Sequence, residues 1–295
     1  ESGARPPITH VHRSTAHHSL TIMEILSRVV EAHTAMMIPA QINTDHAINA
    51  AICFATAFCV LFIVDKAVAR RFKRPFFVLH LVANVVISAL TLGGGLRALL
   101  SPQQCVSVGP DGQPNALYMA WIYAIHVYHP LFFNTNRMDV IHHVPVYVVN
   151  TLMFSVPSVD AIHLQSLILT GVPGGLDYLL QILEGEGLLS RAAYKELCAA
   201  INTYLRAPLG TISAFACLVG VLHAGDAIGG YERCVYTLLG GHAAWNPPFF
   251  CRQAVEANVV DTVNRFGLEA GGIKLPAVRA LCGKQPRDGV KAKAR

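Results

Sequence analysis

Charged residues are scarce in this chain. Only 14% of its 295 residues are Asp, Glu, Lys or Arg, whereas an ordinary soluble domain has about 25%. Because 53% of the residues are hydrophobic, a water-soluble globular protein is not expected. The net charge is only +5, and the Lys and Arg residues cluster in short segments and at the C-terminal end. They form no basic stripe, so nucleic acid is not an expected partner.

Internal repeats, low-complexity segments and dense metal-ligand motifs are also lacking. Membrane di-iron desaturases and hydroxylases carry several HxxxH and HxxHH boxes. The apolar part of this chain offers an HxxH pattern at His126 and His129 and an adjacent pair at His142 and His143. These histidines do not reproduce such a ligand set, and we expect no metal or other cofactor.

What the chain does have is long apolar stretches. A membrane-spanning helix needs about 20 mostly apolar residues, and six stretches approach or reach this length. They are residues 47–64, 76–96, 115–133, 140–159, 161–183 and 207–225. We therefore predict an all-α fold, a polytopic transmembrane bundle of about six spans in a multi-pass integral membrane protein.

The two ends of the chain differ from this central block. Residues 19–38 alternate apolar and charged positions at helical spacing, which predicts an amphipathic helix that lies at the membrane interface or docks on the bundle. A further helix is predicted over residues 252–266, after Pro247 and Pro248. We expect a polar N-terminal segment (1–46), a transmembrane domain (47–228) and an extra-membrane, partly helical C-terminal extension (229–295).

Lys and Arg are distributed unevenly over the predicted loops. The first, third and fifth loops hold nine of them: Lys66, Arg70, Arg71, Lys73, Arg74, Arg137, Arg191, Lys195 and Arg206. The second loop holds Arg97, and the fourth holds none. Because cytoplasmic loops carry an excess of positive residues, we predict that the odd-numbered loops are cytoplasmic. Both termini then lie on the exoplasmic or lumenal side.

The alternating direction of the spans brings polar residues into one half of the bilayer. These residues are His80, His126, His129, His142, His143, Asp177 and Arg206. Ionisable groups are costly in a membrane and usually face a bundle interior or a wet cavity. Adjacent helical residues point about 100° apart, so one ring of the His142 and His143 pair can enter a cavity while the other fixes its tautomer. A hydrogen-bonded packing role remains open for each residue.

Two segments of the chain resemble a known family. The run MDVIHHVPVYVVNTLMF, followed by GLDYLLQILEGEG, resembles the TLC-domain family of multi-pass membrane proteins, which includes ceramide synthases. His142 and His143 match the paired histidines of that family, and Asp177 and Tyr178 match its later Asp-Tyr-Leu-Leu motif. The resemblance covers residues 115–220. It implies an endomembrane location and N-acylation of a sphingoid base from acyl-CoA.

The chain departs from the family pattern near that aspartate. Pro173 and Gly174 replace the His-Asp pair that the family has there, and Gln181 replaces a glutamate. The resemblance therefore supports the fold more than the acyltransferase activity.

Three functions follow as alternatives. The first is a protein that handles or modifies lipids, with His142 or His143 as the general base and Asp177 orienting it. Its expected lipid- or substrate-binding residues are His80, His126, His129, Arg206 and Tyr178. Membrane lipids, acyl-CoA and other membrane subunits are the expected partners. The second is a non-catalytic accessory subunit of a membrane complex. The third is a small-molecule transporter, which the broken fifth span suggests.

Four cysteines fall on the predicted exoplasmic side: Cys105, Cys234, Cys251 and Cys282. Thiols that face an oxidising compartment tend to pair. We therefore predict at least one disulfide among these four and none that involves Cys198. Unpaired thiols in a reducing compartment are the alternative.

Overall fold

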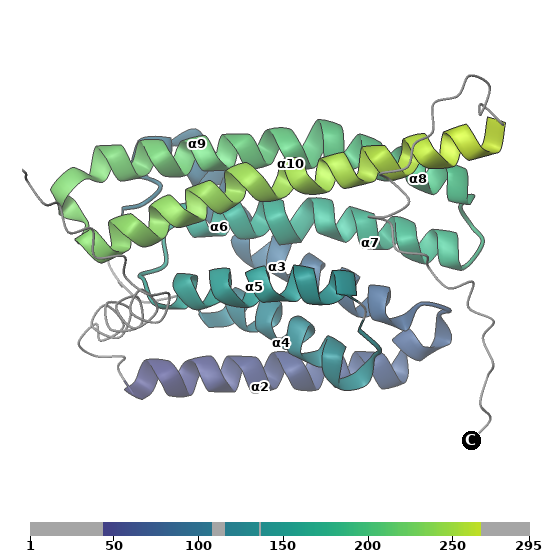
Figure 1. Cartoon of the computed structure of the whole chain (residues 1–295). Helices are drawn as coiled ribbons and strands as arrows, with labels where there is room; N and C mark the ends of the chain where they lie inside the picture. The colour runs from purple at the N-terminus through teal and green to yellow at the C-terminus, as the bar shows by residue number, and fades with distance from the viewer. Residues whose placement is uncertain (1–43, 108–115, 136, 267–295) are drawn as a thin grey trace, which may run out of the picture. The chain divides into compact units, whose positions relative to one another are not determined.

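The computed structural model describes residues 44–107, 116–135 and 137–266, and all secondary structure in these ranges is helical (Figure 1). This confirms the predicted all-α fold, whereas the helix predicted over residues 19–38 lies outside the described residues. The first four helices are α2 (Thr44–Ala67), α3 (Pro75–Leu100), α4 (Ala116–Phe132) and α5 (Arg137–Phe154). The last is α10 (Gly230–Phe266).

Between α5 and α10 lie two long helices, each built from three consecutive segments. The first consists of α6 (Asp160–Ser166), the π-helical segment η3 (Leu167–Gly171) and α7 (Val172–Gly185). The second consists of α8 (Arg191–Ile201), the π-helical segment η4 (Asn202–Arg206) and α9 (Ala207–Ala224). A proline follows each π-helical segment within two residues, at Pro173 and Pro208. Because proline lacks a backbone N–H, the regular α-helical hydrogen-bond pattern is interrupted at both points.

Four described helical stretches are long and apolar enough to cross a membrane: Ala47–Arg71, Pro75–Leu100, Asp160–Gly185 and Arg191–Ala227. They correspond to the first, second, fifth and sixth predicted spans. Helix α4 has 17 residues, and the apolar part of α5, His143–Phe154, is shorter still.

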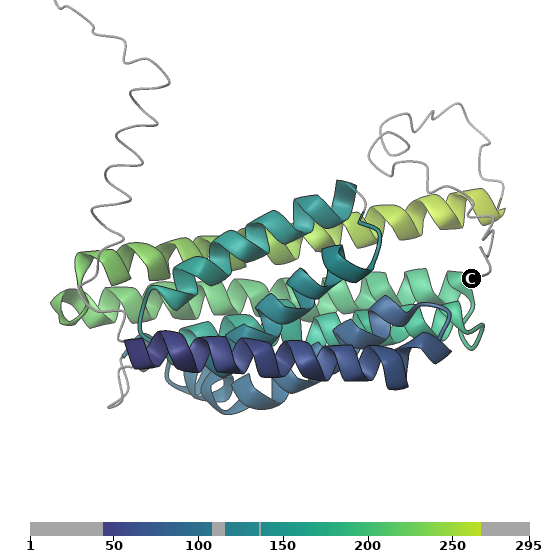
Figure 2. The same cartoon turned by 90° about the horizontal axis from the view of Figure 1, so that it is seen from below.

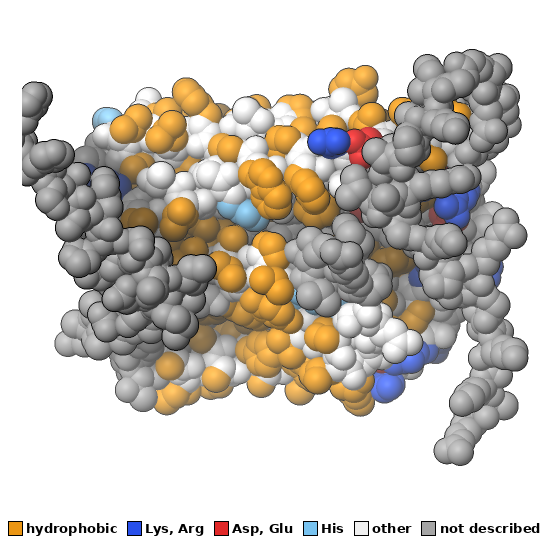
Figure 3. All heavy atoms as spheres, viewed as in Figure 1, with side chains coloured by type: hydrophobic (Ala, Val, Ile, Leu, Met, Phe, Trp, Pro, Cys, Tyr) orange, Lys and Arg blue, Asp and Glu red, His pale blue; other side chains and the backbone are white. Residues whose placement is uncertain are grey.

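Large apolar side chains cover much of the outer surface. Ile63, Phe215 and Leu222 are exposed to 62%, 64% and 72% of their surface. Hydrophobic side chains occupy the middle of the face seen in Figure 3, and most of the Lys and Arg side chains visible there lie toward one end. An apolar exterior of this extent is what a lipid environment requires of a helical bundle.

Ion pairs at the helix ends fix the antiparallel arrangement of α3 with the helix formed by α6 and α7. Arg74, just before α3, pairs with Glu184 at the end of α7 at 2.6 Å. At the opposite end of α3, Arg97 pairs with Asp160 at the start of α6 at 2.7 Å. In Figures 1 and 2, α3 lies alongside the helix formed by α6 and α7.

Helix α10 is longer than the sequence predicted. The helix begins at Gly230 and runs back along α9 and α8. It continues through Pro247 and Pro248 to Phe266. The ring of Pro247 fits into a notch at Gly210 of α9, where a Cβ atom would overlap it. Glycine at this position thus allows the close approach of the two helices.

The end of α10 corrects the predicted side of the C-terminal segment. Asp261, close to the end of α10, pairs with Arg191 at the start of α8 at 3.6 Å. Arg191 belongs to the basic fifth loop, so α10 ends on the same side of the bundle as the basic loops. The prediction that this segment stays on the opposite side is therefore wrong as far as Asp261.

A buried carboxylate joins α2 to α4. The Asp65 side chain has no exposed surface and accepts two hydrogen bonds from Arg70, at 2.8 and 2.9 Å. Tyr128, whose side chain is also fully buried, donates its hydroxyl to Asp65 Oδ2 at 3.0 Å. Several hydrogen bonds thus offset the cost of burying this charge.

The predicted disulfide is absent from the described residues, where Cys105, Cys234 and Cys251 are all free. Cys282 lies outside the described residues. The course of α10 explains why Cys234 and Cys251 do not pair. They are 17 positions apart on one helix, or about 26 Å at 1.5 Å per residue.

Candidate functional site

A cavity of about 210 Å³ lies within the helical bundle. Its walls come from α3, α4, α5, α6, η3, α7, η4 and α10, whereas of the described helices α2, α8 and α9 contribute no lining residue. Part of the wall is apolar: Ile122, Val146, Val149, Met153, Leu169 and Phe250. The polar part includes His80, Asn84, His126, Asn150, Gln165, Ser166, Asp177, Tyr178, Arg206, His242 and Asn246. Polar groups therefore converge in the interior of a bundle whose outer surface is apolar.

Both π-helical segments lie at this cavity. Leu169 and Thr170 of η3 line it, as does Arg206, the last residue of η4. A π-helical turn inserts an extra residue into a helix and is frequently found at functional sites. The two interruptions thus shape the cavity wall on adjacent helices.

The histidines form a connected cluster of rings from three helices. The His80 ring lies 5.8 Å from the His126 ring, and the His126 ring lies 5.1 Å from the His143 ring, measured between centroids. His129 and His143 share a hydrogen bond of 3.1 Å between Nδ1 and Nε2. His80 also stacks on Tyr178 of α7, at 4.4 Å. His80, His126 and Tyr178 line the cavity, whereas His129 and His143 do not.

The tautomer of His126 follows from its backbone contact. Its Nδ1 lies 2.6 Å from the carbonyl oxygen of Ile122, one turn earlier in α4. A carbonyl oxygen only accepts, so Nδ1 carries the proton and Nε2 carries the lone pair of the neutral ring. The carbonyl of His126 itself loses its usual helical donor because residue 130 is proline. The Tyr147 hydroxyl donates to it instead, at 2.8 Å. His126 is thus fixed from both its ring and its backbone.

Asp177 faces the cavity with its carboxylate already partly paired. Its Oδ1 accepts the thiol of Cys198 at 3.1 Å, and its Oδ2 accepts the amide of Gln181 at 3.2 Å. Neither donor is cationic. Among the described residues, Asp177 therefore has no cationic hydrogen-bond partner where it lines the cavity from α7.

Arg206 brings a positive charge to the same cavity. Its side chain is only 9% exposed, and its Nη1 donates to Asn202 Oδ1 at 2.9 Å. Asn202 is held in turn, since its Nδ2 donates to the carbonyl of Cys198 at 2.8 Å. Within the described part of the chain, Arg206 makes no other hydrogen bond and no ion pair. A fixed, buried guanidinium thus faces the cavity with most of its donors unused.

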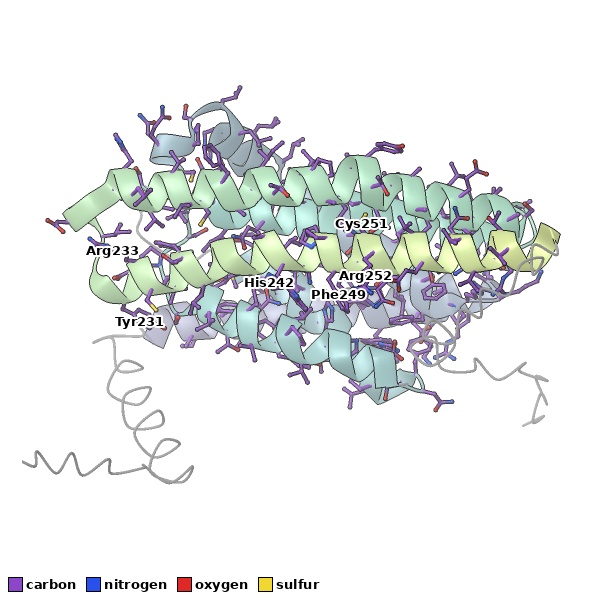
Figure 4. All side chains as sticks on the ribbon, turned by 45° about the horizontal axis from the view of Figure 1, so that its top comes forward. Tyr231, Arg233, His242, Phe249, Cys251 and Arg252 are labelled. Atoms are coloured by element: carbon purple, nitrogen blue, oxygen red, sulfur yellow. The ribbon has the colours of Figure 1, made fainter. Side chains whose placement is uncertain are left out.

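Several further polar atoms around the cavity have no hydrogen-bond partner among the described residues. They are Asn84 Oδ1, both amide atoms of Gln165, Ser166 Oγ, Arg206 Nε and His242 Nδ1. Gln165 is fully buried. His242 is on α10 (Figure 4). Buried polar groups almost always find partners, so this concentration of unpaired atoms marks a place where polar partners from outside the chain are expected.

The structure brings five of the predicted site residues together at the cavity: His80, His126, Asp177, Tyr178 and Arg206. Of the paired histidines, His143 does not line the cavity, but its ring lies 5.1 Å from the His126 ring. The side chain of His142 is outside the described residues. The sequence analysis missed Asn84, Gln165 and His242. The signal for the first two was an uncharged amide within an otherwise apolar span.

Among the described residues, no group of three His, Cys, Asp or Glu side chains has an arrangement that could hold a metal ion. In comparisons with known proteins, no family model, curated protein or solved structure matches this chain.

Proposed function

We propose that this chain is a multi-pass membrane protein that handles lipids by taking up an amphiphilic molecule in the cavity. The observation that carries the proposal is the set of unpaired polar atoms on buried side chains within the bundle, next to an apolar wall. A lipid-like molecule has both chemistries. Its head group supplies partners for Gln165 and Arg206, and its chain contacts Val149 and Met153 of α5.

The membrane topology is part of this proposal. Helices α4 and α5 cross together with the four longer helical stretches, which gives the six predicted spans, and α10 crosses beside α9 as a seventh. The end that holds Arg70, Arg74 and Arg191 is cytoplasmic because positive residues mark that side.

A catalytic form of this function has one specific observation in its favour. His126 presents a tautomer whose Nε2 is basic, and its ring lines the cavity. In a TLC-like acyl transfer from acyl-CoA, His126 supports or replaces the paired histidines as the general base for an amine or hydroxyl. Asp177 lies at the same cavity and contributes a negative charge. Acyl transfer is therefore the second candidate function, after lipid binding.

Lipid co-purification tests the proposed function. The protein is purified in mild detergent and its bound lipids are extracted and identified by mass spectrometry, with and without added acyl-CoA. We expect an amphiphile at close to one molecule per chain. The variant Thr170→Trp fills the cavity at η3 and is expected to abolish its retention. The control Leu179→Trp changes a residue of α7 that is 39% exposed and does not line the cavity.

Each outcome of this experiment has a distinct meaning. Retention by the wild type and by Leu179→Trp, but not by Thr170→Trp, supports lipid binding in the cavity. A new acylated lipid that forms only with acyl-CoA supports the catalytic form. Equal lipid content in all three proteins contradicts the proposal and favours the accessory-subunit alternative.

A further inference from the structure

We propose that the cavity selects single-chain amphiphiles with an anionic head group, a carboxylate or a phosphate, and that Arg206 binds this group together with the amide of Asn84. This inference rests on the proposed function and adds the chemistry of the ligand.

Most hydrogen-bond donors of the Arg206 side chain have no acceptor among the described residues. A guanidinium stays protonated in a protein and presents five N–H donors in a planar fork. Among the described residues, only Asn202 accepts a hydrogen bond from this fork, and it uses one of the five donors. A buried charge without a partner is costly, most of all inside a membrane. A ligand with two acceptor oxygens removes that cost by binding the open side of the fork.

A second polar group, the side-chain amide of Asn84, lies close to the guanidinium of Arg206 at Gly174. Gly174 lies between Asn84 of α3 and Arg206. A Cβ atom at residue 174 would lie 2.8 Å from Asn84 Nδ2 and 3.8 Å from Arg206 Nη2. The missing side chain at Gly174 therefore leaves both donors accessible over the same patch of backbone. Two oxygens of one carboxylate or phosphate can reach both donors at this position.

Asp177 is the other charged residue at the cavity. Its two oxygens accept hydrogen bonds from Cys198 and Gln181, and it forms no ion pair with a described residue. It leaves the open side of Arg206 unoccupied. Because it is negative, Asp177 repels an anionic head group and favours a location of that group at Arg206.

The size of the cavity limits the ligand to one chain. A volume of about 210 Å³ is below the roughly 300–1,000 Å³ of sites that bury a drug-sized molecule. It suits a compact head group and the first part of one alkyl chain. The apolar residues from α5, Val146, Val149 and Met153, provide the wall along which that chain leaves the polar end.

Binding measurements with matched C16 probes in lipid nanodiscs test this inference. The probes are palmitic acid (a carboxylate), palmitoyl-lysophosphatidic acid (a phosphate) and hexadecanol (a neutral head group). We expect at least one anionic probe to bind about tenfold or more tightly than hexadecanol, because a charge-assisted bidentate contact accounts for at least that ratio. The preferred anion then identifies the head group as carboxylate or phosphate.

The variants assign this preference to Arg206. Arg206→Gln is expected to reduce anion binding to the level of hexadecanol. Arg206→Lys retains the charge without the planar fork and is expected to give an intermediate preference. Arg252→Gln is the matched control: it removes the same charge from an exposed position on α10 (Figure 4) and should leave the preference unchanged. Thermal unfolding of each variant verifies that it is folded.

The remaining variant tests the role of Asp177. Asp177→Asn is expected to maintain or strengthen anion binding, because it removes a repelling charge. Loss of anion binding in Asp177→Asn would overturn the inference, as would equal binding of anionic and neutral probes to the wild type. Failure of all three probes to bind would instead contradict the proposed lipid-binding function. Neutral binding without anion preference leaves that function intact, so the two failures are distinguishable.

Discussion

The buried hydroxyl of Tyr128 should change the sign of its contribution to stability when Asp65 is removed. In the wild type, Tyr128→Phe deletes a hydrogen bond to a carboxylate, a contact that contributes roughly 1.5–3 kcal/mol. In Asp65→Ala, the same hydroxyl is fully buried and has lost this acceptor. An unsatisfied buried hydroxyl costs about 1–3 kcal/mol. Adding Tyr128→Phe to Asp65→Ala should therefore be neutral or stabilising.

Arg70 contributes little to this difference. Its side chain is 46% exposed, so water replaces the carboxylate when Asp65 is removed, and we assign less than about 1 kcal/mol to its loss. The expected destabilisation by Asp65→Ala alone is about 2 kcal/mol, mostly from Tyr128. The coupling between the two substitutions should then be about 2 kcal/mol if Tyr128→Phe is neutral in the Asp65→Ala background, and larger if it is stabilising there.

Thermal unfolding in detergent micelles of the wild type, both single variants and the double variant measures this coupling. The control is Tyr123→Phe on the same helix, whose hydroxyl contacts Thr151 at 2.7 Å and has no link to Asp65. It should have the same effect with and without Asp65→Ala. If Tyr128→Phe lowered the unfolding temperature equally in both backgrounds, the two side chains would not be coupled.

Two further predictions concern the packing of α10 and the reactivity of the cysteines. Gly210→Val places a side chain in the position of the Pro247 ring and should destabilise the protein by about 1–3 kcal/mol, as overpacking does. Gly241→Ala, where a Cβ meets no atom within 4 Å, should leave the unfolding temperature unchanged or raise it, and a loss equal to that of Gly210→Val would contradict the notch. Burial raises the pKa of the Cys105 thiol to about 11. Cys105 should therefore resist maleimide at pH 8 until the protein is denatured, whereas exposed Cys234 reacts in the folded state, and peptide mass spectrometry of the labelled protein checks this difference.

The sequence predicted the fold where apolar runs were continuous. Helices α2 and α3 correspond to runs with few charges. The alternating direction of the spans predicted that His80, Asp177 and Arg206 share one half of the bilayer, and the three residues line one cavity. The prediction required only the length of each span and the direction of the chain. It did not depend on detailed packing.

Predictions failed where packing overrides local propensity. The sequence predicted a helix only after Pro247 and Pro248, over residues 252–266, yet α10 runs through both prolines. Gly210 accommodates the Pro247 ring, and α10 packs on α9 before the prolines and on η4 and α8 after them. The amides of Asn84 and Gln165 were missed because each is a single uncharged residue in an apolar run. Their importance lies in their lack of partners, which depends on residues far away in the sequence.

The two π-helical segments also determine which face of each helix points inward. One extra residue in a helix rotates everything after it by about 100° relative to an uninterrupted α-helix. A helical wheel drawn from Asp160 with a constant angle would therefore place Asp177 and Tyr178 about a quarter turn from their actual direction. Deleting one residue from η3 would restore a regular helix and rotate these two side chains away from the cavity, while the apolar length of the span stays nearly the same. The register of the polar site is thus encoded separately from the capacity of the helix to span a membrane.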